Sequence, residues 1–281
     1  MLREAGVVIV TGAAGGLGGA TARHFAERGY RVVGLDINPM VQRLGASHPD
    51  LALQGLTVDH TDLTAVEDAF QVAAGIGPVT HLLAFAGGPV VQEIAHDDEE
   101  EGIIHPRIFT ASLDKNLIGH VNVLWAAQKL LFQGSGDRSV TLVSSINARQ
   151  SWGKPAYSSA KAGLVGLVHA LAGPYGRRGV RLNALEPGSF DTVGARAEYP
   201  GDEARFRRLE ATVPLGRLGA PDDLAATAFA LACELRHVHG AILSVDGGQS
   251  ADRTPAVASG TANRTARPGM KHGRDVADLS A

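Results

Sequence analysis

Short apolar runs alternate along this chain with longer segments in which apolar residues recur at helical spacing. The runs are continuous rather than alternating, which is typical of strands covered on both faces of a sheet. We predict strands at Val7–Val10, Arg31–Leu35, Leu51–Val58, His81–Phe85, Val140–Ser144, Val180–Leu185 and Ile242–Val245. Helices are predicted at Leu17–Arg28, Leu63–Ala74, Phe109–Phe132, Tyr157–Tyr175, Asp202–Glu210 and Pro221–Cys233. Because strand and helix alternate as in βαβ units, the pattern predicts an α/β fold with one doubly wound, seven-stranded parallel sheet and helices on both faces.

Three segments depart from this rhythm. Residues 88–106 contain the acidic run Asp97–Glu101 and no apolar period, so we expect a mobile acidic loop inserted over one edge of the sheet. Residues 251–281 are rich in Ser, Thr, Ala, Gly and Pro, which predicts a poorly ordered C-terminal tail after a single domain spanning residues 1–250. Gly173-Pro174 is expected to stop or kink its helix, because proline cannot donate the helical hydrogen bond.

Composition narrows the class of protein. The chain has 44% hydrophobic residues and 26 basic against 29 acidic residues, which excludes a disordered polyelectrolyte and gives no electrostatic footprint for nucleic acid. Cys233 is the only cysteine, and no apolar run approaches the roughly 18 residues of a membrane span, so we expect a soluble cytoplasmic protein without membrane association. The 11 histidines show no recognised ligand spacing; we expect solvated loop histidines and no metal site.

A glycine-rich segment, Thr11–Gly18, joins the first predicted strand to the first helix. Such a turn needs glycine for its dihedral angles, and its backbone N–H groups, together with the helix dipole, favour binding of a pyrophosphate. The alternative is an ordinary glycine-rich surface turn, but the position between a strand and an amphipathic helix favours dinucleotide binding.

Asp36 ends the second predicted strand, 18 residues beyond Gly18. A carboxylate there can accept hydrogen bonds from both hydroxyls of an adenosine ribose and would repel a 2′-phosphate, so NAD is favoured over NADP. A capping or turn-forming aspartate is the alternative at this position.

Tyr157 and Lys161 lie four residues apart on a predicted helix, so their side chains share one face. An ammonium close to a phenol favours the ionised phenolate and makes the tyrosine a usable base. Ser145 follows a strand and would place a hydroxyl at the carboxyl edge of the sheet, where doubly wound folds bind ligands.

Together these motifs resemble the short-chain dehydrogenase/reductase family over about residues 5 to 250. The motifs, in order, are Thr11-Gly12-x-x-x-Gly16-x-Gly18, Asp36, Asp59, Asn116, Ser144-Ser145, Tyr157-x-x-x-Lys161, Asn183-Ala184-Leu185-Glu186-Pro187-Gly188-x-x-x-Thr192 and Val245-Asp246-Gly247-Gly248. The resemblance implies a Rossmann-like fold, with residues 189–215 forming a substrate lid.

The resemblance also implies residue roles. Tyr157 would be the general acid/base, Ser145 would orient the substrate oxygen, and Lys161 would bind the nicotinamide ribose and lower the pKa of the tyrosine. Asn116 would hold a water molecule in a proton relay, and Asp59 would bind the adenine. The cofactor contacts implied are Gly12, Gly15, Gly16, Leu17, Gly18, Asp36, Ile37, Val58, Asp59, Ala86, Gly87, Tyr157, Lys161, Pro187, Gly188, Phe190 and Thr192.

Two departures from the family pattern concern the site. Ala84-Phe85-Ala86-Gly87 stands where the family usually has Asn-Asn-Ala-Gly, which predicts a less stable sheet or weaker cofactor binding. The spacing from Ser145 to Tyr157 is about one residue shorter than is common in the family, which leaves Ser144 open as the alternative serine.

We therefore expect an NAD(H)-dependent oxidoreductase that interconverts a small-molecule secondary alcohol and a ketone, and a homo-oligomer, either a tetramer or a dimer. The alternative is an isomerase, lyase or cyclase of the same fold that uses bound NAD without net redox change. The sequence leaves the substrate open. Arginines near the predicted lid hint at an anionic compound, although exposed arginines are the commoner explanation: Arg149, Arg196, Arg205, Arg207 and Arg208.

Overall fold

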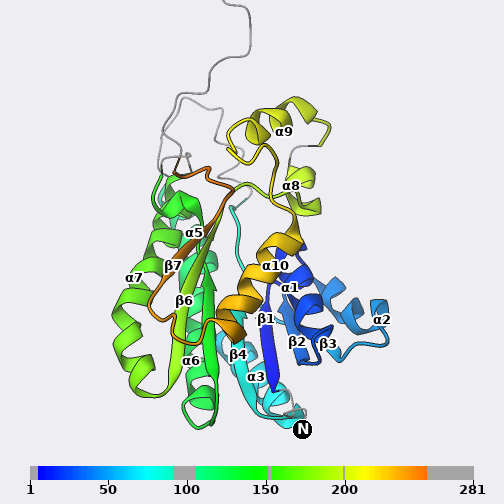
Figure 1. Ribbon diagram of the computed structural model, residues 1–281, viewed down its shortest axis with the longest axis vertical. Coiled ribbons are helices and arrows are strands. Elements are labelled where there is room, and N and C mark those ends of the chain that lie inside the picture. The colour runs from blue at the N-terminus through cyan, green and yellow to red at the C-terminus, as the bar shows by residue number, and fades with distance from the viewer. Residues whose placement is uncertain (1–5, 91–104, 151–153, 199, 252–281) are drawn as a thin grey trace, which may run out of the picture.

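A computed structural model describes residues 6–90, 105–150, 154–198 and 200–251. Its centre is a parallel sheet of seven strands in the order β3-β2-β1-β4-β5-β6-β7 (Figure 1). The strands are β1 Val7–Thr11, β2 Arg31–Asp36, β3 Leu53–Thr57, β4 Val79–Ala84, β5 Arg138–Val143, β6 Val180–Pro187 and β7 Ile242–Val245. The predicted Rossmann-like, doubly wound fold is confirmed.

The central strand β1 shows why both faces of the sheet are covered. Every residue of β1 is buried, and its side chains alternate between two apolar clusters. Val7 and Ile9 belong to the cluster under α3, α6 and α7, whereas Val8 and Val10 belong to the cluster under α1 and α10. Two packed faces require the continuous apolar run that the sequence shows.

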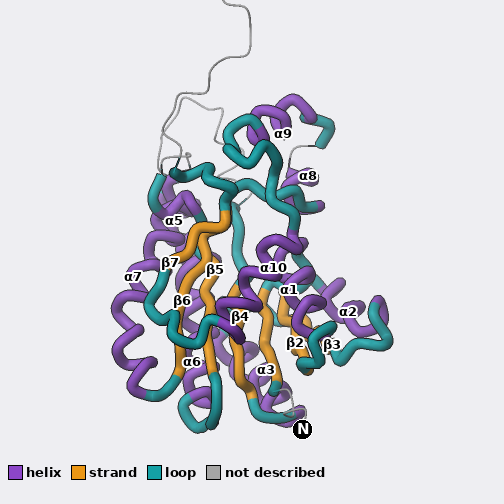
Figure 2. The backbone as a smooth tube through the Cα atoms, in the orientation of Figure 1, coloured by secondary structure: helices purple, strands orange, loops and turns teal. Residues whose placement is uncertain are grey.

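The helices lie on both sides of the sheet, and connecting loops gather at its two ends (Figure 2). One side carries α3, α5, the π-helical turn η3, α6 and α7; the other carries α1, α2, α10 and the π-helical turn η5. The bounds are α1 Gly16–Ala26, η1 Pro39–Arg43, α2 Leu44–Ser47, α3 Leu63–Ile76, α5 Pro106–Leu113, η3 Asp114–Ile118, α6 Gly119–Leu131, η4 Ile146–Ala148, α7 Pro155–Arg177, α8 Val193–Glu198, α9 Glu203–Glu210, α10 Pro221–Phe229 and η5 Ala230–Glu234. Helices α8 and α9 lie at the end of the sheet opposite the N-terminus (Figure 1).

Two of the differences between predicted and observed helices have a clear structural setting. The predicted helix Phe109–Phe132 consists of α5, η3 and α6, with a π-helical turn around Asn116. Helix α7 continues past Pro174 to Arg177, so the predicted stop is wrong. The proline removes the one hydrogen bond that its N–H would donate to the Ala170 carbonyl, but the buried Tyr175 beside it packs edge-on against Phe132, with 5.0 Å between ring centroids.

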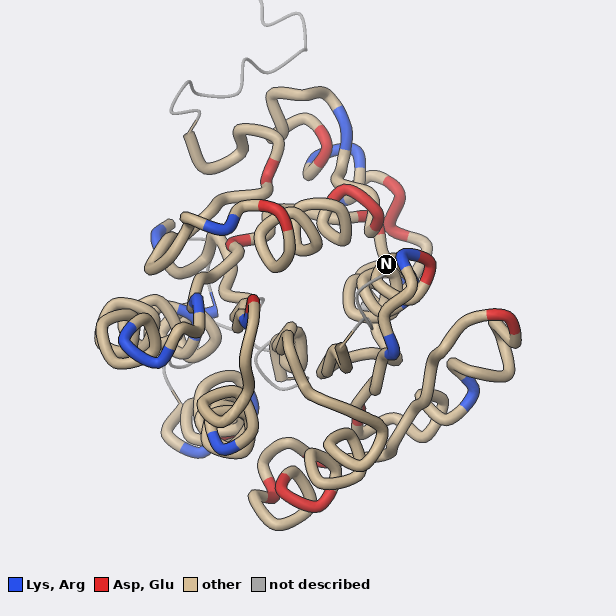
Figure 3. Tube along the Cα trace, turned by 60° about the horizontal axis from the view of Figure 1, so that its bottom comes forward, with Lys and Arg blue, Asp and Glu red and all other residues tan. Residues whose placement is uncertain are grey.

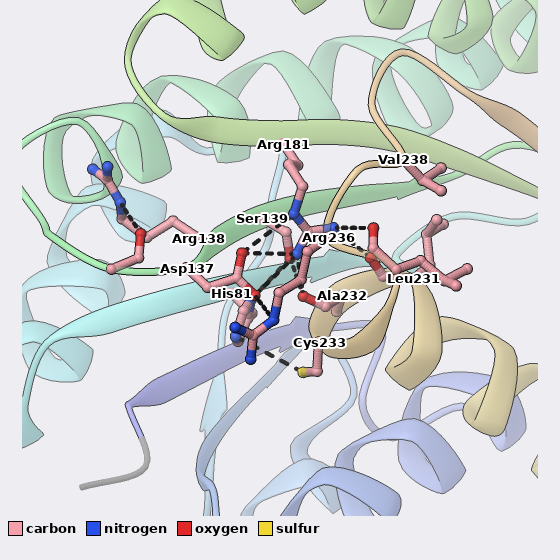
Figure 4. A network of polar contacts seen from close by, with 12 residues as sticks. His81, Asp137, Arg138, Ser139, Arg181, Leu231, Ala232, Cys233, Arg236 and Val238 are labelled. Carbon is pink, nitrogen blue, oxygen red and sulfur yellow. Dashed lines mark hydrogen bonds and ion pairs between the residues drawn. The ribbon is translucent and has the colours of Figure 1, made fainter. Parts of the chain in front are cut away.

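Several histidines are structural rather than solvated, contrary to the prediction. At the amino end of the sheet, the buried His81 lies between Ser139 and Cys233 (Figure 4). The Ser139 hydroxyl donates to the Ala232 carbonyl, so His81 Nδ1–H donates to Ser139 Oγ at 2.8 Å and Nε2 faces the Cys233 thiol at 3.8 Å. Burial lowers the pKa of His81 to about 4, so the ring stays neutral.

Beside this chain of contacts, Arg181 fastens η5 to the sheet. Its guanidinium pairs with Asp137 at 3.1 Å and donates to the carbonyls of Leu231 and Ala232 (Figure 4). Burial raises the pKa of the Cys233 thiol to about 11, so the cysteine here is a packing group and not a nucleophile.

Over the rest of the described chain, basic and acidic positions are interspersed (Figure 3).

Two predictions fall outside the described residues. Most of the acidic loop, residues 91–104, and the tail, residues 252–281, lie there.

Candidate active site

A cavity of about 610 Å³ lies at the carboxyl ends of the strands, where the loops after β1 and β4 diverge. This is the switch point of a doubly wound sheet and its usual ligand site. The cavity brings together most of the predicted site residues: Gly12, Gly15, Gly16, Leu17, Gly18, Asp36, Ile37, Val58, Ala86, Gly87, Ser145, Tyr157, Lys161, Pro187, Gly188, Phe190 and Thr192. Asp59 and Asn116 do not line it.

The glycine turn leaves no room for side chains. Gly12 has φ +71°, a left-handed conformation that favours glycine. A Cβ at Gly18 would lie 2.2 Å from the Gly12 carbonyl oxygen, so only glycine allows the turn to enter α1 here. The first N–H groups of α1, which have no partner within the helix, thus border the cavity and fit the pyrophosphate of a dinucleotide.

Asp36 holds the neighbouring loop as well as lining the cavity. Its two carboxylate oxygens accept from the backbone N–H groups of Asn38 at 2.9 Å and Ala14 at 3.0 Å. The turn-forming role considered from the sequence is therefore present. The carboxylate nevertheless stands on the cavity wall beside the exposed Ile37, where an adenosine ribose would fit.

The two candidate serines have different surroundings. The buried Ser144 hydroxyl donates to the Lys161 carbonyl at 2.8 Å and fastens α7 to the end of β5. Ser145 caps the short helix η4: its Oγ accepts from the Asn147 N–H and donates to Asn147 Oδ1, both at 3.2 Å, and the residue lines the cavity. The Ser144 hydroxyl is held by the shorter, buried bond to a backbone carbonyl, whereas the Ser145 hydroxyl donates to a partly exposed side chain that can give way to a substrate, so the geometry favours Ser145.

Lys161 is buried beside Tyr157. Its ammonium donates to the Val143 carbonyl at 2.8 Å and lies 5.6 Å from the centroid of the Tyr157 ring. Burial, reinforced by the nearby Lys115, lowers the pKa of Lys161 from 10.5 to about 7. Because opposite charge favours the ammonium form, an anionic ligand in the same cavity would raise this pKa again.

Asn116 acts on the backbone of the loop after β4. Its amide donates to the carbonyls of Gly88 and Ser112, both at 3.0 Å, and its Oδ1 accepts from Gly88 N–H at 2.8 Å. The side chain thus holds the edge of the cavity without facing into it. Asp59 Oδ1 similarly accepts hydrogen bonds from the backbone N–H and the hydroxyl of Thr61.

Other groups replace part of the bracing expected from the two missing asparagines. The Thr11 hydroxyl accepts from Ala86 N–H at 3.0 Å, and His120 Nε2 donates to the Ala84 carbonyl at 3.3 Å. Burial holds the pKa of His120 well below its usual range, so the ring is a neutral donor. The end of β4 is therefore tied to α6, and the loop after it to β1, despite the altered sequence.

Sequence reasoning missed several residues of the cavity wall. His60 lines it and donates through Nε2 to the Lys115 carbonyl at 2.7 Å, while Lys115 Nζ donates to the Pro89 carbonyl at 3.3 Å. Lys154 also lines it, as does Arg205, which the sequence marked only as one of five arginines near the predicted lid. A lone lysine or histidine in a helix or loop carries no spacing pattern, and Lys115 could have been singled out only by its place next to Asn116.

No three His, Cys, Asp or Glu side chains converge to hold a metal ion in the described ranges. Within the same ranges, no helix is both long and apolar enough to cross a membrane.

Comparisons with known proteins agree with this geometry. A family model described as enoyl-(acyl carrier protein) reductase matches residues 12–250. The chain is 32% identical over 249 residues to D-threitol dehydrogenase of Mycolicibacterium smegmatis, covering 86% of this chain and 92% of the relative. It is 35% identical over 252 residues to L-rhamnose 1-dehydrogenase (NAD(P)(+)) of Azotobacter vinelandii, covering 86% and 95%.

Among solved structures, an oxidoreductase of the short-chain dehydrogenase/reductase family from Burkholderia thailandensis superimposes with a TM-score of 0.77 at 31% identity, covering 89% of this chain and 94% of that one. The cavity, the glycine turn and these relatives agree. The chain belongs to the short-chain dehydrogenase/reductase family of oxidoreductases, whose members use a nicotinamide dinucleotide.

Proposed function

We propose that this protein is an NAD(H)-dependent oxidoreductase that interconverts a secondary alcohol and a ketone. One observation carries the proposal: a single cavity joins the glycine turn and Asp36 at one end to Ser145, Tyr157 and Lys161 at the other. A dinucleotide held at the first end would extend toward the three polar side chains at the second.

The dinucleotide, when bound, supplies the hydride acceptor or donor. In the oxidative direction, the Tyr157 phenolate removes the proton of the substrate hydroxyl, and Ser145 donates a hydrogen bond to the same oxygen. The Lys161 ammonium, 5.6 Å from the Tyr157 ring centroid, stabilises the phenolate by its charge. Asn116 holds the Gly88 backbone in place at the cavity edge.

Asp36 supports the choice of NAD over NADP. Its carboxylate stands at the adenosine end of the cavity, and a 2′-phosphate at that position would meet a like charge. No lysine or arginine lies in the glycine turn or directly after Asp36. The name of the Azotobacter relative covers both dinucleotides, so the preference rests on Asp36 itself.

Net turnover tests the proposal and separates it from the non-redox alternative. The purified protein is incubated with NAD⁺ or NADP⁺ and a panel of secondary alcohols, including threitol and rhamnose, and with NADH or NADPH and the matching ketones. We expect net NADH formation or consumption. Product formation without net change in NADH would instead support an isomerase, lyase or cyclase.

We also propose a cytoplasmic homotetramer formed through α6 and α7. Exposed apolar side chains on η3 and α6, namely Ile118, Val121 and Trp125, support burial of this surface against another copy. Light scattering on the purified protein tests the tetramer; a dimer would show that only one such surface is used.

A further inference from the structure

Charge is unevenly distributed along the cavity wall. Among the described residues that line the cavity, the basic side chains are Lys115, Lys154, Lys161 and Arg205, and Asp36 is the one carboxylate. Asp36 belongs to the adenosine end. Away from Asp36, the described residues therefore give the cavity wall cations and no carboxylate.

Of the five arginines near the predicted lid, Arg205 is the one that lines the cavity. Several bind carboxylates away from this cavity: Arg149 pairs with Glu186, Arg196 with Asp191 and Glu203, and Arg208 with Asp202. Arg207 is exposed on α9. Arg205, in the first turn of the same helix, lies on the cavity wall together with Phe206 and Leu209.

The position of Arg205 is fixed by the start of its helix. Asp202 caps α9 and its Oδ1 accepts from the Arg205 backbone N–H at 2.8 Å. Phe206, the next residue, is buried. The cap and the buried neighbour hold this turn of the lid, so the Arg205 side chain is presented to the cavity by a defined piece of structure.

Lys154 reaches the cavity by an unusual backbone conformation. It has φ +54° and is the only non-glycine residue with positive φ in the described ranges. Such a conformation costs on the order of 1 kcal/mol and, outside glycine, gathers at functional sites. Lys154 precedes α7 and stands three residues before Tyr157, and both residues line the cavity.

We propose that the substrate is a secondary alcohol, or its ketone, that also carries a carboxylate, and that Arg205 and Lys154 bind this carboxylate. The inference rests on the oxidoreductase function proposed above and adds the substrate class. The planar guanidinium of Arg205 matches a carboxylate through two parallel hydrogen bonds, and the Lys154 ammonium adds a point charge. Phe190, Phe206 and Leu209 supply apolar wall for the carbon skeleton between the two functional groups.

The reaction then balances as hydroxy acid plus NAD⁺ giving oxo acid, NADH and a proton. The carbinol C–H bond breaks and its electron pair leaves with the hydrogen to NAD⁺, while the hydroxyl proton passes to Tyr157. The carboxylate is unchanged and serves only to hold the substrate.

Matched pairs of substrates test the proposal. A series of hydroxy acids, from lactate to hydroxycyclohexanecarboxylate, is compared with the corresponding methyl esters, which differ by the loss of the negative charge. In the wild-type protein, we expect kcat/KM for the best acid to exceed that for its ester by roughly 10- to 100-fold, as for one hydrogen bond to a charged group. Arg205→Met should bring this acid-to-ester ratio close to one, and Lys154→Met should lower it.

Arg207→Met is the matched control, because Arg207 lies on α9 two residues from Arg205 and is exposed. It should keep the wild-type acid-to-ester ratio. Equal kcat/KM values for acids and esters in the wild type, or an Arg205→Met variant that keeps the acid preference, would overturn the substrate class. NADH formation from the esters would meanwhile still support the oxidoreductase function.

A binding measurement decides the case in which no member of the series is turned over. The melting temperature of the NAD⁺-saturated protein is recorded with each acid and each ester. Stabilisation by the acids that Arg205→Met removes would support the carboxylate site and count against the proposed reaction. Equal effects of acids and esters would reject the carboxylate site.

Discussion

The buried Lys161 ammonium should destabilise the folded protein, although its charge serves the proposed chemistry. The side chain is buried, and burial together with Lys115 lowers its pKa from 10.5 to about 7. At about 1.4 kcal/mol per pKa unit, a protonated Lys161 destabilises the native state by roughly 4 kcal/mol at pH 7. Methionine, of similar length and without charge, removes this cost but also the hydrogen bond to the Val143 carbonyl, worth ~1 kcal/mol.

We therefore expect Lys161→Met to raise the unfolding free energy of the ligand-free protein by roughly 3 kcal/mol at pH 7 and its melting temperature by about 5 to 10 °C. The same variant should lose catalytic turnover, because the phenolate of Tyr157 loses its neighbouring cation. The assay is thermal and urea unfolding at fixed protein concentration, without dinucleotide, alongside NADH formation.

The pH dependence gives a second check. The pKa of Lys161 is lower in the folded than in the unfolded chain, so the unfolded chain binds more protons between about pH 7 and pH 10.5. Wild-type stability should therefore rise relative to the variant across this window, and the advantage of Lys161→Met should shrink toward pH 10. Lys129→Met, which removes a surface ion pair with Glu67, is the control and should change stability by less than about 1 kcal/mol. A Lys161→Met protein less stable than wild type at pH 7, with no pH dependence of the difference, would refute the reasoning.

Three further predictions follow from other parts of the molecule. His81 is neutral in the fold, with a pKa of about 4 against about 6.5 when unfolded, so the unfolding free energy of the wild type should fall by roughly 3 kcal/mol between pH 6.5 and pH 4. Urea unfolding of His81→Gln should show much less of this pH dependence, and a variant with the same pH dependence as the wild type would count against a neutral His81. Asp36→Ser should lower the ratio of kcat/KM for NAD⁺ to that for NADP⁺ at least about tenfold, the factor expected for ~1.4 kcal/mol of lost hydrogen bonding and repulsion; an unaltered ratio would show that the carboxylate does not select the cofactor. Gln249 bonds Ser189 and Thr212, near the two ends of the predicted lid, so Gln249→Ala should reduce kcat/KM about tenfold, mainly through KM; a selective loss of kcat would argue for another role.

The strands and the glycine turn could be predicted because the physical requirement is local. A strand packed on both faces needs a continuous apolar run, as in Val7–Val10, and a turn that passes a carbonyl at 2.2 Å from a would-be Cβ needs glycine at position 18. The pairing of Tyr157 and Lys161 could be predicted as well, because two residues four apart on a helix place their side chains on the same face.

Other features depend on contacts between distant segments. Ser144 and Ser145 are adjacent and chemically identical, and only the Lys161 carbonyl distinguishes them. The π-helical turn holds Asn116, whose side chain bonds Gly88, 28 residues away. Arg205 became distinct from its neighbours only when the fold placed it on the cavity wall.

The central claim is that the Tyr157 hydroxyl moves the substrate proton in a cavity that holds the dinucleotide independently. Tyr157→Phe removes that hydroxyl, and Tyr175→Phe is the control, since Tyr175 lies buried on the same helix and its hydroxyl has no hydrogen-bond partner among the described residues. Turnover and NADH affinity are measured for both variants. We expect Tyr157→Phe to lose roughly 10²- to 10⁴-fold in kcat while its NADH affinity stays close to wild type, and Tyr175→Phe to keep both. A Tyr157→Phe protein that turns over substrate at a near wild-type rate would contradict the account.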